Sequence, residues 1–174
     1  MNKTPGFMLG FALLAASATA YADKLRLPAD APPAFQAECA SCHVAFPPQL
    51  LAAEDWQRVM ASLDKHYGDN ATLDEKTRRT IADFLVRNAG SPKKVGAGRT
   101  ASAGSAASMG TANELPRLTT SPWFKRKHHE VPRADWTHAK VKSPANCAAC
   151  HIKAEQGSYR KREIVMPDGK RWDD

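Results

Sequence analysis

The chain carries the string CASCH at residues 39–43 and the string CAACH at residues 147–151. Each is a Cys-x-x-Cys-His pattern, which is typical of the attachment site of a c-type haem. Two thiols about one helical turn apart can add to the two vinyl groups of one porphyrin, and the histidine that follows can bind the iron. The sequence therefore predicts two covalent haems, with thioether bonds from Cys39, Cys42, Cys147 and Cys150 and proximal ligands His43 and His151.

Other uses of a Cys-x-x-Cys pair fit this chain less well. Zinc ribbons separate their two pairs by about 15–20 residues, whereas these pairs begin at residues 39 and 147. A dithiol oxidoreductase does not need a histidine after the second cysteine in both copies. All four cysteines of the chain belong to the two strings, so none is left for another role. The pattern therefore favours haem attachment.

Changes in composition along the sequence indicate four segments. Residues 1–22 resemble an export signal: Lys3 is followed by an apolar run too short to span a membrane and by small-residue cleavage patterns ending at Ala20 and Ala22. The alternative is an uncleaved membrane anchor. We expect a first haem domain over 23–90, a flexible linker rich in Gly, Ser, Ala and Thr over 91–114, and a second haem domain over 115–174. Export predicts a periplasmic protein.

Residues 23–90 predict three short helices. The first begins near Ala34 and carries the first haem string. The second runs from about 49 to 66, with Trp56, Val59, Met60 and Leu63 on one apolar stripe that His66 continues. The third has Thr72 as N-cap and Glu75 as its capping-box partner, buries Ile81, Phe84 and Leu85, and is closed by Gly90 and Ser91-Pro92. So small a domain would need its haem to complete the core.

Residues 115–174 predict little regular structure, because prolines recur throughout the segment. We expect one short helix over about 146–156 that carries the second haem string and ends at Gly157, and a turn over 167–169. Several aromatic residues could form the walls of a haem site; these are Trp123, Phe124, Trp136, Tyr159 and Trp172.

Charge is divided unevenly between the two predicted domains. Residues 23–90 hold 8 Lys and Arg against 10 Asp and Glu, whereas residues 115–174 hold 13 against 7. Two docking faces of opposite sign could steer protein partners. We expect no nucleic-acid partner, because export separates the chain from nucleic acid.

Four histidines remain as candidates for the sixth position of each iron. His66 and Met60 are the candidates for the first haem, and we favour His66 because Met60 is more simply explained by core packing. His128, His129 and His138 are the candidates for the second. His138 lies so close to Cys147 that the chain would have to fold back sharply. Neighbours in an extended chain point to opposite sides, so one of His128 and His129 could face the iron, and the pattern does not choose between them.

These residues resemble the small dihaem cytochromes c of bacteria. The resemblance is carried by residues 118–123 (LTTSPW), Lys127-His128 and 141–151 (VKSPANCAACH), with Ala154 and Gly157, and in the first half by Trp56 and residues 63–68. It implies a mainly α fold: a class I cytochrome c-like N-terminal haem domain and a largely irregular C-terminal haem domain with short helices. It also implies two bis-histidine haems, with His66 and His128 as the sixth ligands. The additional histidines 129 and 138 depart from the family pattern.

The resemblance implies an electron carrier rather than an enzyme. Electrons would pass by outer-sphere transfer from a membrane b-type cytochrome to a soluble haem protein such as a high-spin, oxygen-binding cytochrome c, and we expect a monomer in isolation. The alternative is a haem enzyme in which one five-coordinate iron reduces a small ligand such as peroxide. A third interpretation is a haem-bearing subunit that helps to assemble a larger complex.

Overall fold

The structure, a computed structural model, describes residues 25–96 and 115–172. Within these ranges the regular structure is helical, and β-pairing is limited to isolated bridges such as the one between Arg26 and Ser158. The mainly α fold predicted from the sequence is confirmed. In the part of the chain described, no helix has the length and apolar character needed to span a bilayer. The predicted export signal lies outside the described residues.

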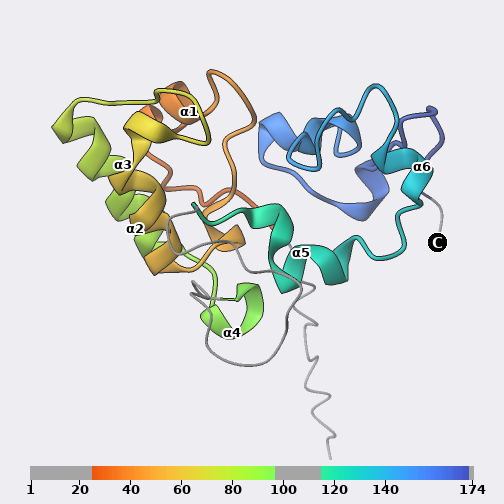
Figure 1. The fold of residues 1–174 in the computed structure, drawn as a ribbon, viewed down its shortest axis with the longest axis horizontal. Coiled ribbons are helices and arrows are strands. Elements are labelled where there is room, and N and C mark those ends of the chain that lie inside the picture. Colours follow the sequence, from red (N-terminus) through yellow and green to blue (C-terminus); the bar gives the residue numbers. More distant parts are fainter. Residues whose placement is uncertain (1–24, 97–114, 173–174) are drawn as a thin grey trace, which may run out of the picture.

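Three helices build the N-terminal half: α1 (Pro33–Cys39), α2 (Ala53–Ala61) and α3 (Glu75–Arg87). Both α1 and α2 lie against α3 (Figure 1). Phe35 on α1 meets Phe84 on α3 with ring centroids 4.9 Å apart. The predicted apolar faces are confirmed, because the buried residues of α2 and α3 include Trp56, Val59, Met60, Ile81, Phe84 and Leu85.

The predicted continuous helix over residues 49–66 is wrong. The chain forms a 3-10 turn η1 (Pro48–Leu50), then α2, then a second 3-10 turn η2 (Leu63–Lys65). The breaks fall at Ala52, which is extended (φ −73°, ψ 160°), and at Ser62. Tertiary contacts outweigh local helix propensity here, since the indole of Trp56 donates to the carbonyl oxygen of Pro48 at 2.7 Å. His66 therefore stands at the end of η2 and not on a long helix.

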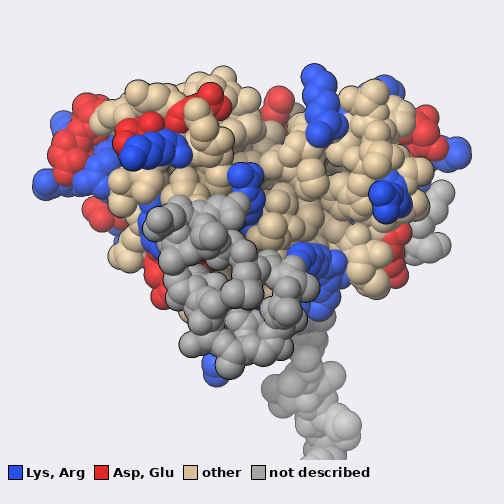
Figure 2. Space-filling view, viewed as in Figure 1, with Lys and Arg blue, Asp and Glu red and all other residues tan. Residues whose placement is uncertain are grey.

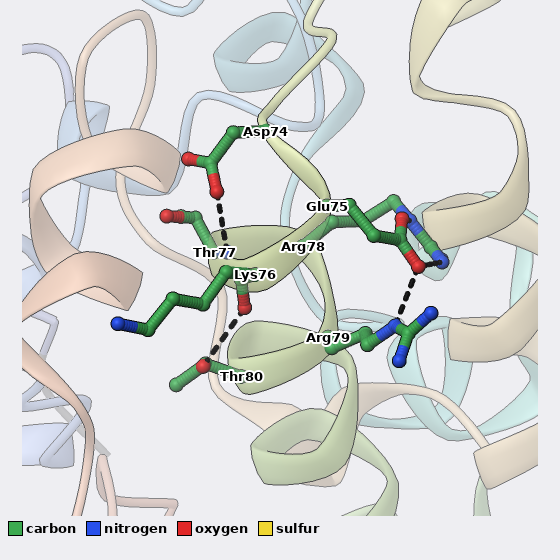
Figure 3. A network of polar contacts seen from close by, with 7 residues as sticks. All are labelled: Asp74, Glu75, Lys76, Thr77, Arg78, Arg79 and Thr80. Atoms are coloured by element: carbon green, nitrogen blue, oxygen red, sulfur yellow. Dashed lines mark hydrogen bonds and ion pairs between the residues drawn. The ribbon is translucent and has the colours of Figure 1, made fainter.

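The predicted capping box at the start of α3 is also wrong. The N-cap is Asp74, whose Oδ1 accepts a hydrogen bond from the backbone N–H of Thr77 at 3.0 Å (Figure 3). The Glu75 carboxylate, the expected capping partner, instead binds the guanidinium groups of Arg78 and Arg79. An ionised carboxylate is favoured over a hydroxyl at this position because it also meets the positive end of the helix dipole.

The segment after α3 is more ordered than predicted. Helix α3 ends at Arg87, before Ser91-Pro92, as expected, but the flexible linker that we expected from residue 91 does not begin there. Instead Pro92 occupies the first position of a further helix, α4 (Pro92–Val95), where its fixed φ and missing N–H are tolerated. Val95 is buried, and α4 lies against α5 (Pro122–Lys127). Residues 97–114 of the predicted linker lie outside the described residues.

The C-terminal half is largely irregular, as predicted. It contains α5, α6 (Arg133–Trp136) and four 3-10 turns: η3 (Leu118–Thr120), η4 (Cys147–Ala149), η5 (Ala154–Gln156) and η6 (Lys161–Glu163). The single helix expected over 146–156 is instead η4 and η5 with a turn between them. Gly157 ends η5 with a left-handed backbone (φ 69°), as expected, and a Cβ there would approach that of Leu27 at 2.9 Å.

The two halves share one apolar core. Leu118 and Phe124 belong to the same buried cluster as Phe35 and Phe84. The hydroxyl of Tyr67 donates to the carbonyl oxygen of Pro116 at 2.5 Å, which ties the end of η2 to the start of the C-terminal half. In Figure 1, α5 lies on the side of the C-terminal half that is next to the N-terminal half. The two halves that carry the haem strings thus pack against each other, although they are far apart in sequence.

Replacing Asp74 by Ala should destabilise the protein. The variant loses the N-cap of α3, so we expect the midpoint of thermal unfolding, followed by circular dichroism, to fall by roughly 2–6 °C. Hydrogen bonding from Thr77 lowers the pKa of Asp74. The stabilisation should therefore be present at neutral pH and be lost as the pH falls through the lowered pKa. Thr72→Ala is the control. An equal fall in its unfolding midpoint would support the capping box predicted from the sequence.

Replacing Gly90 by Ala should destabilise the protein by about 1–3 kcal/mol, because the space around this glycine is filled. A Cβ would collide with the carbonyl oxygen of Gln49 and would lie 2.8 Å from Cγ1 of Val95. Urea unfolding should show the loss, with the exposed neighbour Ser91→Ala as the control. A Gly90→Ala variant as stable as the unmodified protein would contradict the close packing of Gly90 against η1 and α4.

Candidate functional site: two facing histidine pairs

The first haem string lies at the end of α1. Cys39 is the last residue of the helix, and residues 40–42 form a turn, so the predicted helix carries the first cysteine but not the second. His43 follows in the loop before η1. Its Nδ1 lies 2.8 Å from the carbonyl oxygen of Val44. A carbonyl only accepts, so Nδ1 carries the proton and the lone pair is at Nε2.

His66 faces His43. Their ring centroids are 6.2 Å apart, and the ring planes differ by 23°. Burial lowers the pKa of His66, and the neighbouring His43 lowers it further. The ring is therefore neutral at pH 7 and has a lone pair available for a metal. Met60, the other candidate, is buried in the core cluster on α2, as expected for a packing residue.

The second haem string lies in η4 and the turn after it. The backbone N–H of His151 donates to the carbonyl oxygen of Cys147 at 2.8 Å, which places the histidine one turn after the first cysteine. The facing residue is His128, at the C-terminal end of α5. The two ring centroids are 6.1 Å apart and the ring planes differ by 79°. Burial lowers the pKa of His151 to about 4, with a further contribution from His128, so this ring is also neutral.

Of the three candidates for the second pair, His128 is the one that contacts the His151 ring. His129 is exposed, with its Nδ1 2.9 Å from the carbonyl oxygen of Arg126. His138 Nδ1 accepts from the backbone N–H of Lys140 at 3.2 Å. His128 is the C-cap of α5, half-buried against Phe124, and His129 begins the exposed turn that follows, so neither residue is in an extended chain. His128 therefore faces inward while its neighbour faces solvent.

The spacing of both pairs fits a single metal atom between two imidazoles. A ring nitrogen bound to a first-row metal lies about 2 Å from it and roughly 1 Å from its own ring centre. Two rings on opposite sides of one metal would thus have centroids about 6 Å apart, as in both pairs. Among the described residues, no cluster of three or more His, Cys, Asp or Glu side chains could hold a bare metal ion. Two protein ligands suffice when a porphyrin supplies the other four.

Aromatic side chains enclose the histidines in a repeated arrangement. His43 stacks on Phe46 and His128 stacks on Phe124, with ring planes 22° apart in both cases. His66 and His151 are instead flanked by Tyr67 and Tyr159. Phe124 and Tyr159 were predicted as walls, as was Trp136, which lies 5.8 Å from His128. Sequence reasoning missed Phe46 and Tyr67, whose only signal was their position close behind a histidine.

Nδ1 of His66 and Nδ1 of His151 are buried and have no hydrogen-bond partner in the described structure. A metal bound at Nε2, the nitrogen that carries the lone pair in His43 and His128, would leave these two Nδ1 atoms without a partner. The second site also has room for a large group. Beside His128 lies an open hollow of about 360 Å³, walled by Phe124, Trp136 and Pro144. A hollow of this size is within the usual range of cofactor sites.

The cysteine thiols are poorly suited to redox chemistry of their own. Burial raises the pKa of Cys39 to about 11, and burial likewise raises that of Cys147 to about 11. Thiol–disulfide exchange needs the thiolate, which is scarce at neutral pH under these conditions. The structure has no disulfide between the four cysteines. The dithiol interpretation therefore loses support.

Solved structures with this fold are dihaem cytochromes. A dihaem cytochrome type c from Shewanella baltica OS155 is 33% identical, with a TM-score of 0.63, and the match covers 81% of this chain and 97% of that one. A dihaem cytochrome c from Rhodobacter sphaeroides is 38% identical, with a TM-score of 0.57 and coverage of 77% and 99%. A second structure, DHC purified from Rhodobacter sphaeroides, is 37% identical, with a TM-score of 0.56 and coverage of 76% and 99%.

A comparison with curated protein sequences gave no match. The profile of the dihaem cytochrome c family matches residues 35–159, which include both haem strings and all the facing histidines. The predicted cofactors, two covalently bound haem c groups, follow from this match together with the solved structures. The chain belongs to the dihaem cytochrome c family, a class of electron-transfer proteins.

Proposed function

We propose that this chain is a periplasmic electron carrier in which each haem is bound by two cysteines and two histidines. The first haem is held by Cys39, Cys42, His43 and His66, and the second by Cys147, Cys150, His151 and His128. The observation that carries the proposal is the spacing of the two facing pairs, 6.2 Å and 6.1 Å between ring centroids. If each iron were bound by the imidazoles of its two facing histidines, neither iron would be open to a substrate, which favours a carrier over an enzyme.

The residues around each histidine pair are suited to electron transfer rather than to making or breaking bonds in a substrate. A haem iron supplies one-electron chemistry. The backbone carbonyls of Val44 and Phe124 fix the tautomer and orientation of one ring in each pair. Phe124 and Trp136 shield the half-buried ring of His128 from water, so less solvent has to reorganise there when the charge changes.

We further propose that the protein is exported and acts between two partners. The apolar run and small residues of segment 1–22 support export. Membership of the family supports a membrane b-type cytochrome as donor and a soluble high-spin cytochrome c as acceptor. The chain would be a monomer in isolation.

The charges suggest how such partners are distinguished. The last turn of α5 carries three exposed basic residues, Lys125, Arg126 and Lys127, directly before His128. On the face shown in Figure 2, most acidic side chains lie over the half that contains α1, α2 and α3. An acidic partner would therefore dock beside the second haem, and a basic partner beside the first.

Removing either facing histidine should convert one haem to high spin. We expect the unmodified ferric protein to be fully low-spin, and His66→Ala and His128→Ala each to produce one high-spin haem by absorption and electron paramagnetic resonance. His129→Ala and His138→Ala are matched controls that should change nothing. The ligation is wrong if His128→Ala stays low-spin while a control becomes high-spin. A high-spin band in the unmodified protein would favour the enzymatic alternative.

Both haems should have low reduction potentials. Imidazole stabilises ferric iron more than a thioether does, so two-histidine ligation lowers the potential relative to His/Met ligation. Spectroelectrochemical titration of the whole protein should show two transitions well below that of a mitochondrial-type cytochrome c. His66→Met should raise one transition and leave the other unchanged. A transition of the unmodified protein in the mitochondrial range would contradict the proposed ligands.

A further inference from the structure

His66 lacks the Nδ1 hydrogen bond that orients His43 and His128. Nδ1 of His43 is held by the carbonyl oxygen of Val44, and Nδ1 of His128 by that of Phe124. Nδ1 of His66 is buried without a hydrogen-bond partner in the described structure. Histidines that bind metals are normally oriented through the ring nitrogen that does not bind the metal. Something else must therefore set the plane of the His66 ring, which lies within 23° of the His43 plane.

Tyr67 is placed to do this. Its ring stands edge-on to the His66 ring, with centroids 4.8 Å apart and planes 77° apart. A rigid aromatic edge against the imidazole limits rotation of the imidazole about the bond to Cβ. Because the two residues are neighbours in the chain, any displacement of one is passed directly to the other.

The tyrosine is itself fixed from the opposite side. Its hydroxyl donates to the carbonyl oxygen of Pro116, and the guanidinium of Arg117 lies 5.0 Å from the centre of its ring. Both partners belong to the C-terminal half. The orientation of His66 therefore depends on a segment that continues through η3 into α5 and His128.

The backbone at Tyr67 indicates that this placement is imposed. Its φ is +51°, a left-handed conformation that is unusual for a bulky side chain. Such a conformation persists when surrounding contacts hold it, and residues of this kind cluster at functional sites. The turn is closed by the backbone N–H of Asp69, which donates to the carbonyl oxygen of His66 at 3.0 Å, and Gly68 supplies a second positive φ (111°).

We propose that Tyr67 is a positioning residue of the first haem site, which holds the His66 ring nearly parallel to the His43 ring. The proposal rests on the proposed function, in which His66 binds iron. Near-parallel imidazole planes split the iron orbitals that interact with the ligand π systems, whereas near-perpendicular planes leave those orbitals almost equal in energy. The first haem should therefore give a rhombic low-spin signal, and the second, with planes 79° apart, a highly anisotropic one.

The test is electron paramagnetic resonance of the ferric holoprotein. In Tyr67→Ala we expect the rhombic signal to broaden and to shift toward the highly anisotropic type, while both haems stay low-spin. Tyr67→Phe retains the ring edge but loses the bond to Pro116, and should give a smaller shift. Tyr159→Ala, at the tyrosine beside His151, is the matched control and should leave the rhombic signal unchanged.

The outcomes separate this proposal from the ligation on which it rests. His66→Ala in the same series should abolish the rhombic signal and create a high-spin one. If it does, and Tyr67→Ala leaves the rhombic signal as it was, His66 is a ligand but Tyr67 does not position it. If His66→Ala stays fully low-spin, the ligation itself is wrong. If Tyr67→Ala does not fold, Tyr67→Phe decides. Faster limited proteolysis of Tyr67→Phe would show that the contact between the halves is loosened. An unchanged rhombic signal in that variant would then overturn the role of the Pro116 bond.

Discussion

The structure depends on one distance, the separation of about 6 Å between two facing imidazole rings. Two histidine pairs in the fold have this separation, 6.2 Å and 6.1 Å between ring centroids, and different kinds of element supply them. In the first site the rings come from the loop after α1 and from the end of η2. In the second they come from the end of α5 and the turn after η4. Each ring stands just beyond a short helix or turn, where the backbone is free to direct the side chain inward.

The two sites contain the same two kinds of histidine, but the haem string supplies a different kind in each site. Each has one histidine with Nδ1 held by a carbonyl oxygen and a phenylalanine stacked on its ring, and one histidine with an unbonded Nδ1 beside a tyrosine. In the first site the carbonyl-held ring belongs to the haem string, at His43, whereas in the second it is the facing ring, at His128. The ring planes differ by 23° in one site and by 79° in the other. With equal spacing and unequal angles, the two proposed haem sites would have the same kinds of ligand and different electronic structures.

Contact between the halves is part of the site and not only of the fold. Neither half has a large core, and a small apolar core supplies little stability. Leu118 and Phe124 from the C-terminal half complete the cluster around Phe35 and Phe84. Phe124 also stacks on His128, so one side chain joins the shared core to the second iron site. A change in how the halves pack would therefore reach both histidine pairs.

The sequence determined the cofactors, the helical class and the buried faces of α2 and α3, because these depend on spacing along the chain: two cysteines and a histidine within five residues, or apolar residues three and four apart. It did not determine where the helices break or which residue caps α3, since Trp56 bonding to Pro48 and the carboxylate of Asp74 outweighed the local pattern. The sequence pattern also did not choose between His128 and His129, and only the family resemblance favoured His128. Only the tertiary structure shows that the end of α5 turns His128 toward His151, and that Tyr67 reaches Pro116, because both depend on how distant segments pack.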